Sequence, residues 1–169
     1  FKDSFVGVIN IINGAGGAIA MLPVALMASK IGRKKSIIIG LALSAVAFVP
    51  CFLMTANTPG VGVLFPLCFI LSGFGLVCVN VNTFPMVTEL SKGSNVGKYT
   101  GYYYISSMTA QSLTPAFAGI FMDKISSNAV FVYAIIFVTL AIVSCIFIKH
   151  GDNKQKKKQK VVEYFAEEE

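Results

Sequence analysis

The sequence lacks two residue types on which protein sites often depend. It contains no tryptophan and a single histidine, His150, which lies next to a strongly basic C-terminal segment. Zinc coordination and histidine-based catalysis therefore have no material in the apolar part of the chain. We expect neither a metal site nor a cofactor.

Cysteine is present but is not arranged for chemistry. The four cysteines stand far apart and include no CxxC pair; they are Cys51, Cys68, Cys78 and Cys145. Each lies inside an apolar stretch, where cysteine usually behaves as a small buried hydrophobe. Disulfide and metal roles are much the weaker interpretations.

Charge is missing over most of the chain, and this absence predicts the fold class. The uncharged runs are residues 4–29, 36–88, 99–122 and 125–148. The second run contains the turn signal Asn57-Thr58-Pro59-Gly60, which divides it in two. A helix needs about 20 mostly apolar residues to cross a bilayer. We therefore predict an all-α, polytopic membrane protein with transmembrane helices at about 4–29, 36–55, 61–87, 100–122 and 127–148.

The distribution of cations predicts the orientation. Of the 14 lysines and arginines, twelve lie between the first and second predicted helices, between the third and fourth, or after the fifth. The other two, Lys2 and Lys124, lie before the first helix and between the fourth and fifth. The richer side should be cytoplasmic, with the beginning of the chain outside. We assign residues 1–150 to a transmembrane domain and residues 151–169 to a disordered cytoplasmic tail. The tail's lysines favour anionic membrane lipid rather than nucleic acid as a partner.

The chain begins with Phe1, and its first predicted helix starts almost at once. We expect it to be the downstream part of a longer protein.

The first cytoplasmic loop carries a motif. It runs from Ala25 to Lys35 and places a tight turn at Gly32 among four cations. On composition alone it could be no more than a positive-inside anchor. Its layout, however, resembles the loop motif Gly-x-x-x-Asp-Arg-x-Gly-Arg-Arg/Lys of the major facilitator superfamily. Lys30, Gly32, Arg33 and Lys34 match, whereas Ala25 and Ser29 replace the first glycine and the aspartate. The resemblance implies helices eight to twelve of a twelve-helix carrier, a partial six-helix half.

A second stretch narrows the resemblance. Residues 80–89, Asn-Val-Asn-Thr-Phe-Pro-Met-Val-Thr-Glu, and residues 97–104, Gly-Lys-Tyr-Thr-Gly-Tyr-Tyr-Tyr, resemble the tenth and eleventh helices of sugar–cation symporters. The plant sucrose symporters and the glycoside–cation symporters are the most similar groups. The resemblance implies transport of a sugar, a disaccharide or hexose, by alternating access.

Polar side chains inside the helices are the candidate contacts for a solute, since unpaired polar groups are costly in lipid. Helical spacing places Asn10 with Asn13, and Tyr103 with Ser107 and Gln111, whereas Asn82 points away from Asn80 and is expected to join helices. The simpler interpretation for any single residue is a bond between helices. The predicted substrate-binding residues are Asn10, Asn13, Asn80, Tyr103, Ser107 and Gln111. We expect them to converge on one surface, which faces the missing half.

The predicted gate lies at the cytoplasmic side. Glu89 should approach Arg33 or Lys30 of the motif loop, with Gly32 providing the turn; the alternative is a solvated carboxylate. These four residues are the predicted gating set.

The leading hypothesis is therefore a multi-pass carrier of a small neutral solute, a sugar, coupled to a cation. No carboxylate lies between Asp3 and Glu89 or between Glu89 and Asp123, so the coupling ion would bind in the absent N-terminal half. Alternatives are a carrier or uniporter of another neutral solute, and a membrane scaffold without transport. An intramembrane enzyme is weakest, because the helices contain no cluster of acid–base residues.

Overall fold

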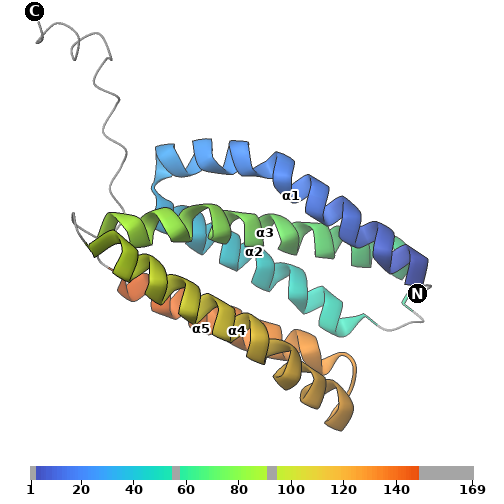
Figure 1. The fold of residues 1–169 in the computed structure, drawn as a ribbon. Helices are drawn as coiled ribbons and strands as arrows, with labels where there is room; N and C mark the ends of the chain where they lie inside the picture. The colour runs from blue at the N-terminus through green and yellow to red at the C-terminus, as the bar shows by residue number, and fades with distance from the viewer. Residues whose placement is uncertain (1–2, 55–57, 91–94, 149–169) are drawn as a thin grey trace, which may run out of the picture.

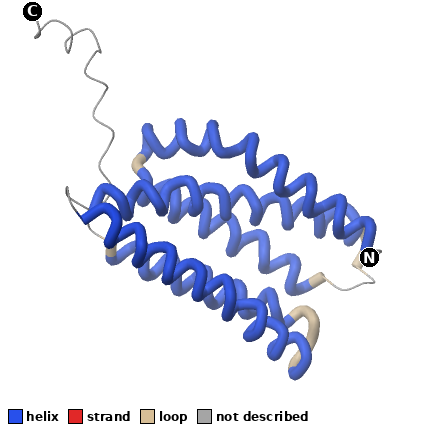
Figure 2. The backbone as a smooth tube through the Cα atoms, in the orientation of Figure 1, coloured by secondary structure: helices blue, strands red, loops and turns tan. Residues whose placement is uncertain are grey.

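The computed structural model describes residues 3–54, 58–90 and 95–148, and all regular structure in these ranges is helical (Figure 2). The five helices are α1 (Asp3–Ile31), α2 (Arg33–Leu53), α3 (Val61–Leu90), α4 (Val96–Lys124) and α5 (Ala129–Phe147). The predicted all-α fold is confirmed. The predicted disordered tail lies outside the described residues.

The helix ends differ from the predicted ones mainly where charge was used as a boundary. α2 begins at Arg33 rather than residue 36, and α4 begins at Val96 rather than residue 100. Lysine and arginine have good helix propensity, so a charged residue limits the apolar run without ending the helix.

Within the described residues, four helices are long and apolar enough to cross a membrane: Gly7–Ile31, Arg33–Leu53, Val61–Glu89 and Ala129–Phe147. We predicted five transmembrane spans, and α4 is less apolar than the other four helices and does not meet the same criterion. Its 29 residues would reach about 43 Å, so length is not the reason. The reason is a series of uncharged polar side chains, namely Thr100, Ser106, Ser107, Thr109, Gln111, Ser112 and Thr114.

The helices pack around α2 and α3, which lie in the middle of the bundle with α1 on one side and α4 and α5 on the other (Figure 1). The α2–α3 crossing depends on Gly40 and Gly75. A Cβ atom at Gly40 would lie 2.5 Å from the Cβ of Cys78 and 2.6 Å from the carbonyl oxygen of Gly75. Only glycine permits this approach of the two backbones.

A buried polar network runs along the same interface. Asn82 is 2% exposed, and its amide donates to the hydroxyl of Ser36 at 3.1 Å and to the carbonyl of Cys78 at 2.7 Å. About two turns further along α2, the hydroxyl of Ser44 lies 3.1 Å from the carbonyl of Gly40 and 3.3 Å from that of Ser72. The predicted interhelical role of Asn82 is confirmed.

The antiparallel helices α2 and α5 cap each other. The ammonium of Lys34, in the first turn of α2, donates to the carbonyls of Ile146 at 2.8 Å and Ile148 at 2.7 Å. At the other end, the amide of Asn128 donates to Phe52 at 3.4 Å and to Met54 at 3.2 Å. The last carbonyls of a helix have no hydrogen-bond donor within that helix. A side chain at the start of each of these two helices therefore donates to the carbonyls at the end of the other.

Candidate functional site

The junction of α1 and α2 forms what we call the basic end of the bundle, where Lys30, Arg33, Lys34 and Lys35 lie. Gly32 links the helices with φ 99°, a conformation that side-chain-bearing residues rarely adopt. Its N–H donates to Ala28 at 2.9 Å, and its carbonyl accepts from Ser36 at 3.1 Å, so one glycine ends α1 and begins α2. The sharp junction sets Arg33 at the first position of α2.

Arg33 forms an ion pair with Glu89, near the end of α3. The predicted approach of Glu89 to a motif-loop cation is therefore confirmed for Arg33, whereas Lys30 is exposed at the end of α1. The two paired side chains are 16% and 28% exposed. The second carboxylate oxygen of Glu89 is buried and accepts no hydrogen bond from the described residues. Removing Arg33 would thus leave a poorly solvated negative charge.

A cavity of about 140 Å³ lies beside this pair, between α1, α2 and α3. It is lined by Ala25, Ala28, Ser29, Arg33, Val81, Asn82 and Pro85. Arg33 of the ion pair and the buried side chain of Asn82 therefore border the same space. Its small size suits water or small ions rather than a sugar.

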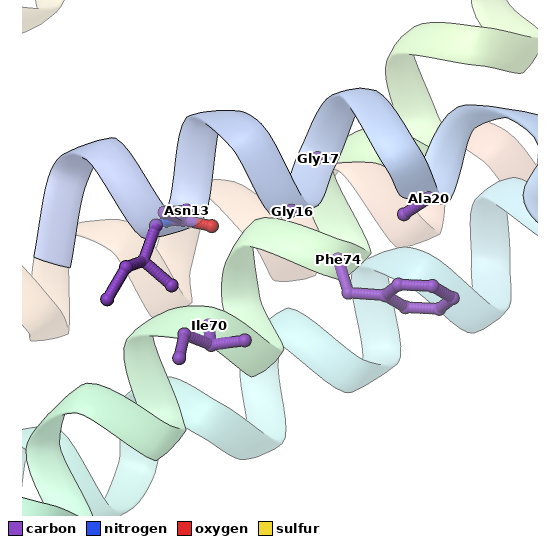
Figure 3. Close-up of a pocket in the computed structure, with 7 residues that line it drawn as sticks. Asn13, Gly16, Gly17, Ala20, Ile70 and Phe74 are labelled. Atoms are coloured by element: carbon purple, nitrogen blue, oxygen red, sulfur yellow. The ribbon is translucent and has the colours of Figure 1, made fainter.

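A second cavity, of about 100 Å³, separates α1 from α3 nearer the middle of the bundle (Figure 3). Asn13 lies in it beside Gly16 and faces Ile70 and Phe74 of α3. The amide donates to the carbonyl of Phe69 at 3.5 Å, a long hydrogen bond. In this arrangement Asn13 contacts the backbone of α3, and its predicted contact with a solute stays a prediction.

A third cavity, larger than the other two, is an open groove of about 500 Å³ between the end of α3 and the start of α4. We call it the tyrosine groove; it is lined by Val87, Tyr99, Tyr102, Tyr103, Ser106 and Ser107. Tyr103 and Ser107 belong to the predicted set, so the structure brings these two together. Tyr99, Tyr102 and Ser106 were missed. Tyr99 lies four residues before Tyr103 and Ser106 three residues after it, so helical spacing was a usable signal for these two.

Aromatic contacts fix the wall of this groove. The ring of Tyr103 packs on Phe84 with centroids 5.6 Å apart and on Tyr104 with centroids 5.4 Å apart. The ammonium of Lys98 lies 5.8 Å from the ring centre of Tyr102, within the range of a cation–π contact. Rings and ammonium thus form an ordered surface at the basic end.

The remaining predicted contacts, Asn10, Asn80 and Gln111, are exposed and line none of these three cavities. α1 and α4 each pack against α3 but, among the described residues, not against one another. The structure therefore places the predicted set in two regions, α1–α3 and α3–α4. Convergence of all six residues on one surface stays a prediction.

The described residues contain no group of three histidine, cysteine or acidic side chains that could hold a metal ion. Within the same ranges Cys51, Cys78 and Cys145 are buried and Cys68 is half-buried. The geometry offers hydrogen-bonding and aromatic surfaces together with the Arg33–Glu89 ion pair at a helix junction. Such surfaces are suited to binding and gating.

Comparison with known proteins agrees with this description. The family model of the Major Facilitator Superfamily matches residues 1–166, almost the whole chain. No curated protein and no solved structure matches the chain significantly. The chain belongs to the Major Facilitator Superfamily and is a multi-pass membrane protein from a family of transporters that carry small solutes.

Proposed function

We propose that the chain supplies helices eight to twelve, the C-terminal half, of a carrier that moves a sugar with a cation by alternating access. In this assignment α1 is the eighth helix, α3 the tenth and α4 the eleventh. The motif loop at Gly32 and the resemblance of residues 80–89 and 97–104 to sugar–cation symporters support it. The positive-inside rule puts the basic end in the cytoplasm.

The observation that carries the proposal is the character of α4. This helix is long enough to span a membrane, contains no buried residue, and is rich in hydroxyl and amide side chains. A helix of this kind would be unfavourable against lipid but suits the wall of a water-filled path. Its cations, Lys98 and Lys124, lie near its ends. An anionic solute would favour a cation at depth, so a neutral solute fits better.

A sugar offers hydroxyl groups that donate and accept hydrogen bonds, and C–H faces that pack on aromatic rings. We assign its contacts to Asn10, Asn13, Asn80, Tyr103, Ser107 and Gln111. Gln111 is the strongest single candidate because it lies near the middle of α4, is exposed, and can both donate and accept. The long bond from Asn13 to Phe69 could exchange for a solute hydroxyl.

The gate is assigned to the ion pair between Arg33 and Glu89, with Lys30 and Gly32 completing the motif junction. The pair joins the start of α2 to the end of α3 on the cytoplasmic side. We propose that it holds this side closed in one state of the carrier and rearranges in the other.

The test is uptake of a panel of labelled mono- and disaccharides by the full-length protein in vesicles. We expect uptake of at least one sugar, and accumulation when a proton or sodium gradient is imposed. A protein that inserts and folds but takes up none of the panel would contradict the sugar assignment.

One observation favours a second candidate, a uniporter of a neutral solute. The chain has no carboxylate between Asp3 and Glu89 or between Glu89 and Asp123, so its helix interiors offer no ion-coupling site. The same vesicles decide between the candidates. Uptake that equilibrates but never accumulates under either gradient identifies the uniporter.

A further inference from the structure

The tyrosine groove has the dimensions and chemistry of a ligand site. Its volume of about 500 Å³ falls in the range of small-molecule pockets in proteins. Three tyrosines and two serines line it, with Val87 as the aliphatic contact.

The hydroxyls of the groove are set to accept hydrogen bonds. Ser106 donates its proton to the carbonyl of Tyr102 at 2.8 Å, and Ser107 donates to that of Tyr104 at 3.2 Å. Each serine oxygen therefore keeps free lone pairs for a donor outside the helix. The tyrosine rings add flat apolar faces beside these acceptors.

The groove adjoins the proposed solute path along α4. Residues four apart on a helix form a continuous ridge, and Tyr99, Tyr103, Ser107 and Gln111 occupy successive positions of one such ridge. From Tyr99 to Gln111 this ridge rises about 18 Å. A solute leaving Gln111 toward the basic end would meet Ser107 and Tyr103 next.

We propose that the tyrosine groove is a second sugar-binding station, which shares Tyr103 and Ser107 with the proposed contacts and is occupied on the way between Gln111 and the basic end of the carrier. This inference rests on the proposed function, sugar transport. Tyr102 and Tyr103 pack on the C–H faces of the sugar, and Ser106 and Ser107 accept protons from its hydroxyls. The station is separate from the Arg33–Glu89 pair.

An anionic lipid headgroup is the competing occupant. A headgroup of this kind would require several cations around the groove. Among the described residues Lys98 lies near it, and its ammonium lies over the ring of Tyr102. Uncharged side chains line the groove, with tyrosine rings beside two serine acceptors, so a neutral ligand with C–H faces and hydroxyls matches it better.

The test places a cysteine in the groove of the full-length protein and measures its labelling. Ser106→Cys is reacted with N-ethylmaleimide, and the unsubstituted full-length protein gives the background from its native cysteines. We expect a saturating transported sugar to slow labelling of Ser106→Cys about five-fold, because a bound sugar keeps the reagent out of the groove in most of the molecules. Adding Tyr102→Ala should remove this protection.

Tyr104→Phe is the matched control, since Tyr104 neighbours the groove without lining it. It should leave protection in place. Protection that survives Tyr102→Ala but disappears with Gln111→Ala would mean that sugar closes the groove from a distance, and it would overturn the station. Protection by vesicles rich in anionic lipid, and not by sugar, would assign the groove to lipid.

Failure of this inference is distinguishable from failure of the proposed function. If the protein takes up a sugar but that sugar never protects Ser106→Cys, the station is wrong and sugar transport stands. If no sugar is taken up and none protects, sugar transport itself is wrong.

Discussion

The α2–α3 interface and helix α4 contain similar polar side chains in opposite settings. At the interface Asn82, Ser36 and Ser44 are buried, and their hydrogen bonds join the helices or close on their own backbone. On α4, by contrast, Ser106, Ser107 and Gln111 are not buried. Residue type is therefore a poor guide to role in this protein. Burial and hydrogen-bond partners separate the side chains that hold helices together from those left for a solute.

The largest difference between the two regions should appear when a methyl group is added to the α2–α3 interface. Gly40→Ala would place its Cβ 2.5 Å from the Cβ of Cys78, so α2 and α3 must separate. We expect a loss of about 3 kcal/mol or failure to fold. Thermal unfolding followed with a thiol-reactive dye measures this, since three of the cysteines are buried.

The control is Gly101→Ala in α4, where an added Cβ meets nothing within 4 Å. It should leave the melting temperature unchanged or slightly raised, because alanine favours helix. Equal losses from both substitutions would remove the distinction between the two regions.

The next effect concerns the ion pair. Arg33→Gln should lower stability by about 1–3 kcal/mol, because the carboxylate of Glu89 is left partly buried without its partner. The exchange Arg33→Glu with Glu89→Arg should restore part of the loss and part of the transport rate. If the exchange is no better than the sum of its single substitutions, the pair has no role of its own.

A smaller loss is expected from Asn82→Ala. Hydrogen bonds between membrane helices are each worth about 0.6 kcal/mol on average, with a maximum near 1.7. Asn82 makes one bond to Ser36 and one within α3, so we expect a loss of about 1 kcal/mol in the same unfolding assay. The solute concentration giving half-maximal transport should not change. A selective change in that concentration would move Asn82 into the solute site.

The smallest effect on stability is expected from Gln111→Ala. Gln111 is exposed, so its loss should leave the melting temperature within about 1 °C. Its effect should fall on transport, with the apparent KM for sugar raised about five-fold. Unchanged transport would assign Gln111 to packing and would contradict the proposed site.

Much of the fold could be predicted from uncharged runs and helical spacing. The separation of Asn82 from Asn80 follows from the angle between successive residues of a helix, and the Arg33–Glu89 contact follows from opposite charges on one membrane side. The Gly40–Gly75 approach could not be predicted, because a single helix pattern does not specify the register of its neighbour. The groove at Tyr99 and Tyr102 was missed because tyrosines near a helix end also suit a membrane interface.

Because α2 and α5 cap each other at both ends, the two helices must have matching lengths. α2 has 21 residues and α5 has 19, or about 32 and 29 Å, close to the thickness of a bilayer's hydrocarbon core. Lys34 and Asn128 reach their carbonyls at opposite ends only while these lengths correspond. A slip of α5 by one turn, about 5.4 Å, would break the bonds at both ends together. The two helices should therefore move together as one rigid body, and the motif loop at the start of α2 should move with them.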